Sequence, residues 1–514
     1  MASLIQNPKT RPQPKGWGIG RRRHAPAFRR GQERVHRRLT TYAAALLTLV
    51  AVLAAACSGG GSSLETPEAG SPVASAAASD GGRVLYVATD GGDAADGSVE
   101  HPWRTLQHAA DSVLPGDTVL VEEGSYHEEV ALTRSGEANR PIGFRAAAGD
   151  TVTLEGGGEL GSAFTIGSGT SQVWLRGFRL TDYRGWSISL EGNNRDIVIS
   201  GIDSSGSDSG VHLTLGEHGK PEEGPVDRVL IQDSDFHHHR FGGIDCTPGP
   251  CNRLQISNVR SYHNGEAGDW GADGIAVEMG EDIRIEGCQV YENGGDGIDL
   301  NSRDSGPVSG IEVRGCQVWG NKRNGIKLWR GGRIRDSLVH SMGSAGIAMG
   351  SEGAYEIVST LVARSGLDGD YGVVVAYPEE SGPQSPVTLR LRNSIFAFNN
   401  GGIYLGENVK LDEDYDLFFS RDDCEIEAAF SDREDGCFSR DDVASGVWFQ
   451  ETGNGRHSLD ADPRFVDAEG GDYHLRPESP ARDVGDPEQG GTPDMEGRQR
   501  PWQGGVDMGP YEAP

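Results

Sequence analysis

The chain has 514 residues, of which 76 are Gly, and a formal net charge of −30. Glycine is about twice as frequent as usual, and its lack of a three-residue period excludes a collagen-like protein. The first 56 residues hold 11 Lys and Arg and one acidic residue, so the rest holds 36 basic and 76 acidic residues, a net charge of −40. Such a surface repels nucleic acid, which we do not expect as a partner, whereas its carboxylates can assemble sites for hard cations.

An apolar run of 15 residues at 42–56 (YAAALLTLVAVLAAA) follows Arg37 and Arg38. It is shorter than the roughly 20 residues that span a bilayer. Its small residues lead directly into Cys57, which resembles a bacterial lipoprotein signal and implies a lipid on Cys57. The protein is therefore expected to be exported, as a membrane-anchored cell-surface lipoprotein. A plain cleaved signal peptide, which would give a secreted protein, is the alternative.

Cysteine usage also fits an exported protein. Two pairs flank a turn or a loop and are disulfide candidates: Cys246 with Cys251, and Cys424 with Cys437. Cys288 and Cys316 occupy equivalent places in a repeat and are expected to be buried thiols. None of these spacings resembles a zinc site.

A loose repeat covers residues 172–406. Each unit has an alternating strand, such as VWLRGFRL at 173–180, followed by a Gly that opens a second apolar strand. The second strands begin with GVHL at 210, GIDC at 243, GIAV at 274, GIDL at 297, GIKL at 325, GIAM at 346, GVVV at 372 and GIYL at 402. The steps between them are 33, 31, 23, 28, 21, 26 and 30 residues.

A period of this size indicates a solenoid. The apolar residues alternate with period two and are largely β-branched, which excludes helical repeats, and the unequal steps exclude a propeller. We therefore predict an all-β fold, a single-stranded right-handed parallel β-helix. Asn and Gly recur at one turn (YHNG, YENGG, NKRNG, FNNGG), where we expect left-handed backbone. An amphipathic segment at 105–113 is predicted to cap the N-terminal end of the core.

The predicted organisation has five parts. They are a lipoprotein signal at 1–56 with a true start near residue 35, a flexible tether at 57–82, an N-terminal cap and first coils at 83–160, β-helix repeats at 161–408, and C-terminal coils, an acidic loop and a cap at 409–514.

Aligning the coils at their Gly stacks several charged residues in columns. Asp273 and Asp296 share the position before the Gly, while Asp299 and Lys327 share the position two after it and are predicted to point outward. Stacked carboxylates repel one another unless a cation neutralises them. Asp273, Asp296 and Asp299 are therefore candidate Ca²⁺ ligands. A solvated acidic ladder is the alternative interpretation.

A basic cluster surrounds Lys327 in the sequence. Its members are Lys322, Arg323, Lys327, Arg330, Arg333 and Arg335. Six cations within 14 residues of so acidic a chain favour the binding of an acidic ligand such as a uronic-acid polymer. Ion pairs with the acidic residues of neighbouring coils are the alternative.

The segments ADGIAV at 272–277, GDGIDL at 295–300 and NGIKL at 324–328 resemble the core of the calcium-dependent pectate lyases of polysaccharide lyase family nine. In that family the segments read roughly ADGFAV, DDGWDL and NGFKL. The resemblance implies that Asp273, Asp296 and Asp299 bind catalytic Ca²⁺ and that Lys327 removes the C5 proton of the sugar acid. The first Asp of the family's DDG is Gly295 here, so one ligand of the family pattern is missing.

Two further groups are weaker candidates. Alternate members of His237–His239 could bind a transition metal, although a polar turn is the simpler interpretation. Five tryptophans are candidate sugar platforms or packing residues: Trp174, Trp186, Trp270, Trp319 and Trp329.

The sequence thus predicts a surface-anchored polysaccharide lyase, a carbon–oxygen lyase, that acts on a pectate-like polymer by Ca²⁺-dependent β-elimination. A nearby cation and partial burial are expected to lower the pKa of Lys327 towards neutrality, whereas Asp299 opposes this unless the metal neutralises it. The alternatives are a non-catalytic glycan-binding β-helix with a degenerate site and a uronate epimerase, for which no second catalytic acid was identified. We expect an acidic polysaccharide as partner, contact with the membrane only through the lipid, and a monomer.

Overall fold

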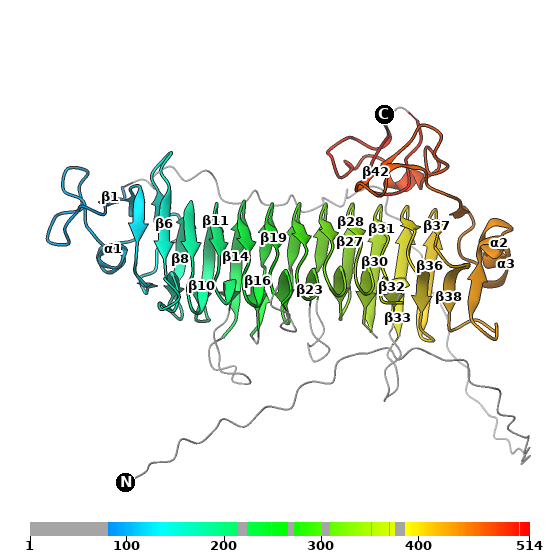
Figure 1. Cartoon of the computed structure of the whole chain (residues 1–514), viewed down its shortest axis with the longest axis horizontal. Helices are drawn as coiled ribbons and strands as arrows, with labels where there is room; N and C mark the ends of the chain where they lie inside the picture. Colours follow the sequence, from blue (N-terminus) through cyan, green and yellow to red (C-terminus); the bar gives the residue numbers. More distant parts are fainter. Residues whose placement is uncertain are drawn as a thin grey trace, which may run out of the picture. The chain divides into compact units, whose positions relative to one another are not determined.

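The computed structural model describes residues 81–513, except 214–223, 248, 266–271, 301–308, 351, 370, 376–385 and 503. Within this part, three long parallel sheets, here called A, B and C, run side by side along a solenoid (Figure 1). Each coil contributes one strand to A, then one to B, then one to C. The predicted single-stranded parallel β-helix is therefore confirmed.

The strands of each sheet follow one another in coil order. Sheet A contains β1 (Val84–Val87), β2 (Thr118–Val121), β5 (Ile142–Ala146), β8 (Ser171–Arg176), β11 (Arg195–Ser200), β14 (Val226–Gln232), β18 (Gln255–Ser257), β21 (Arg284–Glu286), β24 (Glu312–Arg314), β27 (Gly332–Arg335), β30 (Gly353–Val358), β33 (Val387–Arg392) and β36 (Val409–Asp414), with β17 (Cys251–Asn252) beside β14. Sheet B contains β3 (Gly124–Tyr126), β6 (Val152–Glu155), β9 (Phe178–Thr181), β12 (Asp203–Ser205), β15 (Asp235–His237), β19 (Arg260–Tyr262), β22 (Gln289–Tyr291), β25 (Gln317–Trp319), β28 (Leu338–His340), β31 (Leu361–Ala363), β34 (Ile395–Ala397), β37 (Leu417–Phe419) and β40 (Leu459–Asp460). Sheet C contains β4 (Val130–Leu132), β7 (Phe164–Ile166), β10 (Trp186–Leu190), β13 (Ser209–Leu213), β16 (Gly242–Cys246), β20 (Ile275–Val277), β23 (Ile298–Leu300), β26 (Ile326–Leu328), β29 (Ile347–Met349), β32 (Tyr371–Val375), β35 (Gly401–Leu405), β38 (Cys424–Ala428) and β39 (Cys437–Ser439).

The core is made of columns of apolar side chains inside the coils. In sheet A, for example, Ile256, Ile285, Val313 and Ile334 stand in register and are fully buried. Successive coils lie about 4.8 Å apart, so each apolar side chain packs on its equivalents above and below. This continuous burial stabilises strands of only three residues, which would not persist alone.

Each coil has three strands where the sequence predicted two. The segment 173–180 was predicted as one strand, but Gly177 has φ 78° and divides it into β8 and β9. Asp233 and Asn258 divide later coils in the same way, with φ 51° and 52°. One residue in left-handed backbone turns the chain from sheet A to sheet B without disturbing the alternation on either side. The prediction of a single strand here was wrong for that reason.

The recurring Asn turn between sheets B and C is a buried ladder. Asn264 Nδ2 donates to Asn293 Oδ1 at 2.9 Å, and Asn293 Nδ2 donates to Asn321 Oδ1 at 2.9 Å. The left-handed residue is the one before each Asn, such as His263 with φ 53° and Glu292 with φ 54°. The Asn residues are thus required for their side-chain amides, which satisfy buried turn backbone.

Helix α1 (Leu106–Ser112) lies at the N-terminal end of the solenoid (Figure 1). Thr105 begins the helix by accepting a hydrogen bond from the His108 backbone N–H at 3.2 Å. Leu106 and Ala109 are fully buried against the first coils. The helix confirms the predicted N-terminal cap.

The predicted C-terminal cap is divided between two places. Helices α2 (Arg440–Ala444) and α3 (Val447–Thr452) lie at the end of the solenoid, where the Trp448 ring packs on Phe438 with centroids 4.6 Å apart. The following tail, with the hairpin β41 (Phe465–Asp467) and β42 (Asp472–Leu475) and the short 3-10 helix η1 (Pro487–Gln489), packs on the outer face of sheet B (Figure 1).

A change along one column of sheet B explains where the tail binds. The outward position is Gln in β22 and β25, but it is Leu338, Leu361, Ile395 and Leu417 in the next four coils. The tail covers these apolar side chains with Phe465, Tyr473 and Leu475 among others. Arg500, fully buried, anchors it through an ion pair with Asp336 at 2.8 Å.

Both predicted cysteine pairs are joined as disulfides, Cys246 to Cys251 and Cys424 to Cys437. Cys288 and Cys316 are free and buried in the core. Cys57 and the predicted signal segment lie outside the described residues. In the part of the chain that is described, no helix is both long enough and apolar enough to cross a membrane.

Candidate active site on sheet C

Asp299 and Lys327 lie next to each other on the outer face of sheet C. They occupy the central positions of β23 and β26, which pair in parallel with Asp299 opposite Lys327. Their neighbours Ile298, Leu300, Ile326 and Leu328 are fully buried. The alternation of a strand therefore turns both charged side chains outward.

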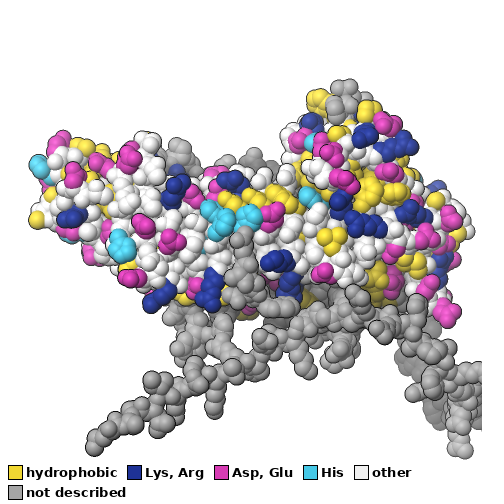
Figure 2. All heavy atoms as spheres, viewed as in Figure 1, with side chains coloured by type: hydrophobic (Ala, Val, Ile, Leu, Met, Phe, Trp, Pro, Cys, Tyr) yellow, Lys and Arg dark blue, Asp and Glu magenta, His cyan; other side chains and the backbone are white. Residues whose placement is uncertain are grey.

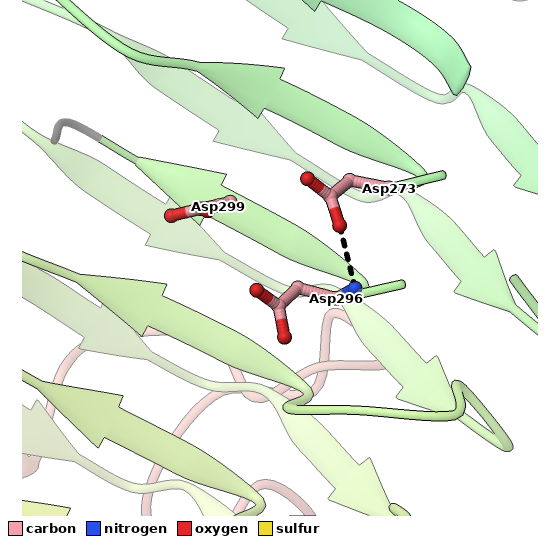
Figure 3. Close-up of side chains that lie close together, drawn as sticks. All are labelled: Asp273, Asp296 and Asp299. Carbon is pink, nitrogen blue, oxygen red and sulfur yellow. Dashed lines mark hydrogen bonds between the residues drawn. The ribbon is translucent and has the colours of Figure 1, made fainter. Parts of the chain in front are cut away.

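Asp273 and Asp296 lie at the turn that leads into sheet C, one coil apart. The Asp296 backbone N–H donates to Asp273 Oδ1 at 2.6 Å (Figure 3). Asp296 is only 1% exposed, and its Oδ1 accepts hydrogen bonds from the backbone N–H and the Nδ2 of Asn324, both at 2.8 Å. Asn324 continues the same column into the next coil. Asn324 was not among the predicted site residues, although its place before the Gly of NGIKL was a usable signal.

Asp273, Asp296 and Asp299, here called the acidic cluster, each place a carboxylate oxygen within 4.8 Å of the others. Lys327 Nζ closes one side of the cluster, 2.5 Å from Asp299 Oδ2 and 3.1 Å from Asp296 Oδ2. The Trp329 ring lies 5.7 Å from the same ammonium group. The sequence thus brings three acids and one base from three successive coils into one group.

Burial and mutual repulsion perturb these groups. The pKa of Asp273 is raised by burial and by the charges of Asp296 and Asp299. Burial is also the main reason that the pKa of Asp299 rises to about 6, although Lys327 opposes it. Burial lowers the pKa of Lys327, but the attraction of Asp299, Asp296 and Asp273 is together the larger effect. The pKa of Lys327 is therefore raised. The carboxylates thus stabilise the protonated ammonium group of Lys327, which agrees with the opposing effect expected of Asp299. The lowering of the pKa that is expected when a cation neutralises these carboxylates stays a prediction.

Gly295 is closely surrounded. A Cβ atom at this position would lie 2.3 Å from Asp273 Oδ1 and 3.0 and 3.1 Å from backbone atoms of Ala272. Two hydrogen bonds hold the backbone of Gly295 in place, so it cannot easily move away from Asp273. The Gly295 N–H donates to Ala272 O at 2.9 Å, and the Gly295 carbonyl accepts from the Arg323 N–H at 3.1 Å. The Asp273 carboxylate thus occupies the space into which a side chain at 295 would project.

The acidic cluster suits a calcium ion. Calcium prefers six to eight oxygen ligands, and the three carboxylates offer up to six. Asp299 Oδ1 is buried and has no hydrogen-bond partner among the described residues. A buried carboxylate oxygen left in that state costs free energy that a bound cation would recover. The residues present therefore fit the ion that the sequence predicts.

The basic cluster of the sequence is dispersed by the fold. Lys322 and Arg323 lie on the turn before β26, and Arg330 lies on the turn after it. Arg333 and Arg335 project from β27 on sheet A, where both pair with Glu356 at 3.1 and 3.5 Å. The six cations therefore do not form one patch on the surface. On the face shown in Figure 2, basic side chains likewise stand in small groups among acidic ones.

The His237–His239 segment does not bring its alternate members together, as the weaker interpretation, a transition-metal site, would require. His237 points outward and stacks on Tyr262, with centroids 4.9 Å apart, whereas His239 is buried and bonds to Ser204 and the Ser207 backbone. Period two would place both on one face, but the left-handed His238 between them (φ 54°) turns the chain. On the face of the molecule drawn in Figure 2, a group of histidines lies beside an apolar stripe.

The predicted tryptophan platforms are scattered. Trp319 stacks on Tyr291 in an aromatic column of sheet B, and Trp174 lies on sheet A. Trp186 stacks on His212, with centroids 4.7 Å apart, and His212 shares the outward column of sheet C with Asp299. Trp270 lies outside the described residues. Of the four predicted platforms in the described residues, Trp186 begins a strand of sheet C and Trp329 directly follows another, so these two lie at the sheet that carries the acidic cluster.

Known proteins are similar to this chain in sequence and in structure. It is 23% identical over 483 residues to the uncharacterized protein YwoF of Bacillus subtilis, covering 78% of this chain and 93% of that protein. It is 34% identical over 221 residues to pectate lyase PEL9 of Emericella nidulans, covering 42% of this chain and 49% of that enzyme. The crystal structure of pectate lyase Pel9A matches with a TM-score of 0.49 and 17% identity, covering 84% of this chain and 96% of that one.

The chain spans about half the length of the curated pectate lyases it matches. A family model described as the Pel9A-like, right handed beta helix region matches residues 85–365, more than half of the chain. That region contains the acidic cluster, Lys327 and the stacked strands that position them. The chain therefore belongs to the Pel9A-like family of right-handed β-helix proteins.

Proposed function

We propose that the protein is a surface-anchored polysaccharide lyase that cleaves a uronic-acid polymer by calcium-dependent β-elimination. The observation that carries the proposal is the contact of Lys327 Nζ with Asp296 and Asp299 on the outer face of sheet C. A base and a set of cation ligands are the two components that this reaction needs. Relatives named as pectate lyases support the choice of a pectate-like substrate.

Asp273, Asp296 and Asp299 are the proposed calcium ligands. When bound, calcium would contact the substrate carboxylate, acidify the adjacent C5 proton and stabilise the negative charge that develops. Asn324 holds Asp296 through two hydrogen bonds and so orients its carboxylate.

Lys327 is the proposed general base. Its neutral Nζ takes the C5 proton, the C5–H electrons form the C4–C5 double bond, and the C4–O bond breaks so that the leaving oxygen takes a proton from water. Neutralising Asp296 and Asp299 removes the attraction that raises the Lys327 pKa, and burial then favours the neutral amine. The base is therefore competent only when the acidic cluster is occupied by a cation.

Arg330 is proposed to hold a substrate carboxylate at the edge of the site, since it follows β26 directly and a guanidinium binds carboxylate in a bidentate manner. Lys322 and Arg323, on the turn before β26, are proposed to do so at the other edge. Arg333 and Arg335 lie on another sheet, and their role is considered below.

An assay of unsaturated uronide products tests the proposal. With polygalacturonate we expect ultraviolet-absorbing products in calcium and none after EDTA, because the cluster that activates both substrate and base is then empty. Addition of calcium should restore the rate. Absence of calcium-dependent product from pectate, alginate and other uronate polymers would falsify the lyase proposal.

A non-catalytic glycan-binding protein is the second candidate. It applies if no cation neutralises Asp296 and Asp299, since an ammonium group paired with two carboxylates is a poor base. Polymer binding without any product would support this alternative.

Surface anchoring rests on the segment before Cys57. We expect wild-type protein to incorporate labelled fatty acid and to sediment with membranes, and Cys57→Ser protein to lose the label. Equal labelling of both proteins would refute attachment at Cys57.

A further inference from the structure

A groove of about 840 Å³ lies on sheet A, whereas the acidic cluster lies on sheet C. Its uncharged lining includes Gly310, Gly331, Gly332 and Ala354. Its charged lining consists of Arg284, Arg330, Arg333, Arg390, Lys410, Glu312, Glu356 and Asp412. Among its described lining residues are none of the proposed calcium ligands and not Lys327. We call it the sheet A groove.

The charges of the groove form an ordered column. Arg284, Glu312, Arg333, Glu356, Arg390 and Asp412 stand in register on six successive coils. The arginines recur on every second coil, about 9.6 Å apart. Arg330, which pairs with Glu352, and Lys410 lie beside this column. With Glu352 included, five basic residues stand against four acidic ones, so the groove is locally basic in a chain whose formal net charge is −30.

Glu356 cannot accept hydrogen bonds from all the guanidinium N–H groups of the arginines that surround it. Glu356, with its side chain 14% exposed, pairs with Arg333, Arg335 and Arg390 at 3.1, 3.5 and 3.1 Å. Each guanidinium has five N–H groups, whereas one carboxylate accepts about four hydrogen bonds. The side chains of Arg333 and Arg390 are 65% and 38% exposed, so their remaining donors face solvent. They are available to a ligand with its own carboxylates.

We propose that the sheet A groove is an exosite that binds a segment of a polyuronate chain outside the catalytic cluster. Guanidinium groups bind carboxylates in a bidentate manner, which suits sugar acids. The intervening Glu312 and Glu356 disfavour nucleic acid, whose duplex carries one charge per about 1.7 Å. A polymer with sparser carboxylates can place them on the arginines and span the acidic positions with neutral hydroxyls.

The groove adjoins the proposed active site. Arg330 lines the groove and is three residues from Lys327, which limits the distance between their Cα atoms to about 11 Å. A long substrate can therefore occupy both places, whereas a short oligomer bound at Lys327 does not reach Arg390. The choice of ligand rests on the proposed function, but the binding itself does not require catalysis.

The test variant is Arg333→Gln with Arg390→Gln, which keeps part of each stem and leaves Glu356 paired with Arg335. The matched control is Arg179→Gln with Arg253→Gln, two exposed arginines on other coils that each pair with an Asp. Calorimetric titration with polygalacturonate in EDTA measures binding without the calcium cluster. The melting temperature of each variant checks folding.

We expect the groove variant to bind polygalacturonate about tenfold or more weakly, as the loss of two charge-assisted contacts predicts, and the control to match the wild type. In calcium, KM for the polymer should rise while kcat/KM for a trimer stays unchanged. Equal affinity of the groove variant and the wild type, or an equal loss in the control, would overturn the exosite. Binding that depends on the groove in a protein without lyase activity would uphold it and refute the proposed function instead.

Discussion

Replacing Lys327 by alanine is expected to lower the rate of β-elimination on polygalacturonate by about 10²- to 10⁴-fold, the usual contribution of a general base. Lys327 is the one described cation in contact with both Asp296 and Asp299. In its absence, a water molecule at that position would be too weak a base to remove the C5 proton. The measurement is the initial rate of unsaturated product formation at saturating calcium and substrate.

Lys327→Arg separates the chemical role from the structural one. Removing Lys327 leaves two buried carboxylates unopposed, and breaking such a pair costs about 3–5 kcal/mol, so part of the alanine effect could be instability. Arginine retains the positive charge but does not lose its proton in proteins. We expect Lys327→Arg to melt close to the wild type and to be as inactive as Lys327→Ala. Substantial activity in the arginine variant would show that Lys327 is not the base.

Restoring the family's residue with Gly295→Asp is expected to weaken calcium binding. A Cβ at 295 would meet Asp273 Oδ1 at 2.3 Å, so the new side chain displaces the Asp273 carboxylate from its place over the Asp296 N–H. Overpacking of this kind costs about 1–3 kcal/mol, which corresponds to about a five- to 150-fold loss of affinity where the whole cost opposes calcium binding. Calorimetric titration with calcium measures the effect.

Gly295→Ala is the matched control because it adds the Cβ without a carboxylate. If the clash between the new Cβ and Asp273 determines the outcome, both variants bind calcium more weakly than the wild type. Their melting temperatures then rise less on addition of calcium than that of the wild type. Tighter calcium binding by Gly295→Asp would show instead that Asp273 moves aside and that the missing ligand limits the site. Wild-type protein that binds no calcium would refute the site itself.

The solenoid and the outward column of sheet C are predictable from the sequence. Period-two alternation and the Gly before each second strand suffice to align GIDL with GIKL, which places Asp299 opposite Lys327. This alignment succeeds because β-strand geometry is local and because parallel coils repeat at a constant spacing, so position in the repeat determines position in space. The apolar neighbours of both residues then require the charged side chains to face outward.

Other features depend on contacts that no repeat encodes. One left-handed residue divides each predicted first strand between sheets A and B. The turn at Gly331 (φ 104°), between β26 and β27, separates Lys327 on sheet C from Arg333 and Arg335 on sheet A, although all three lie within nine residues. The tail covers sheet B because Leu338 and the apolar residues of its column pack on Phe465 and other apolar residues of the tail, which lie outside the repeat. The direction of the Lys327 pKa shift and the fit of Asp273 over Gly295 are balances between burial, charge and contact distance. Each of these is set by atoms brought together by folding, so only the tertiary structure decides it.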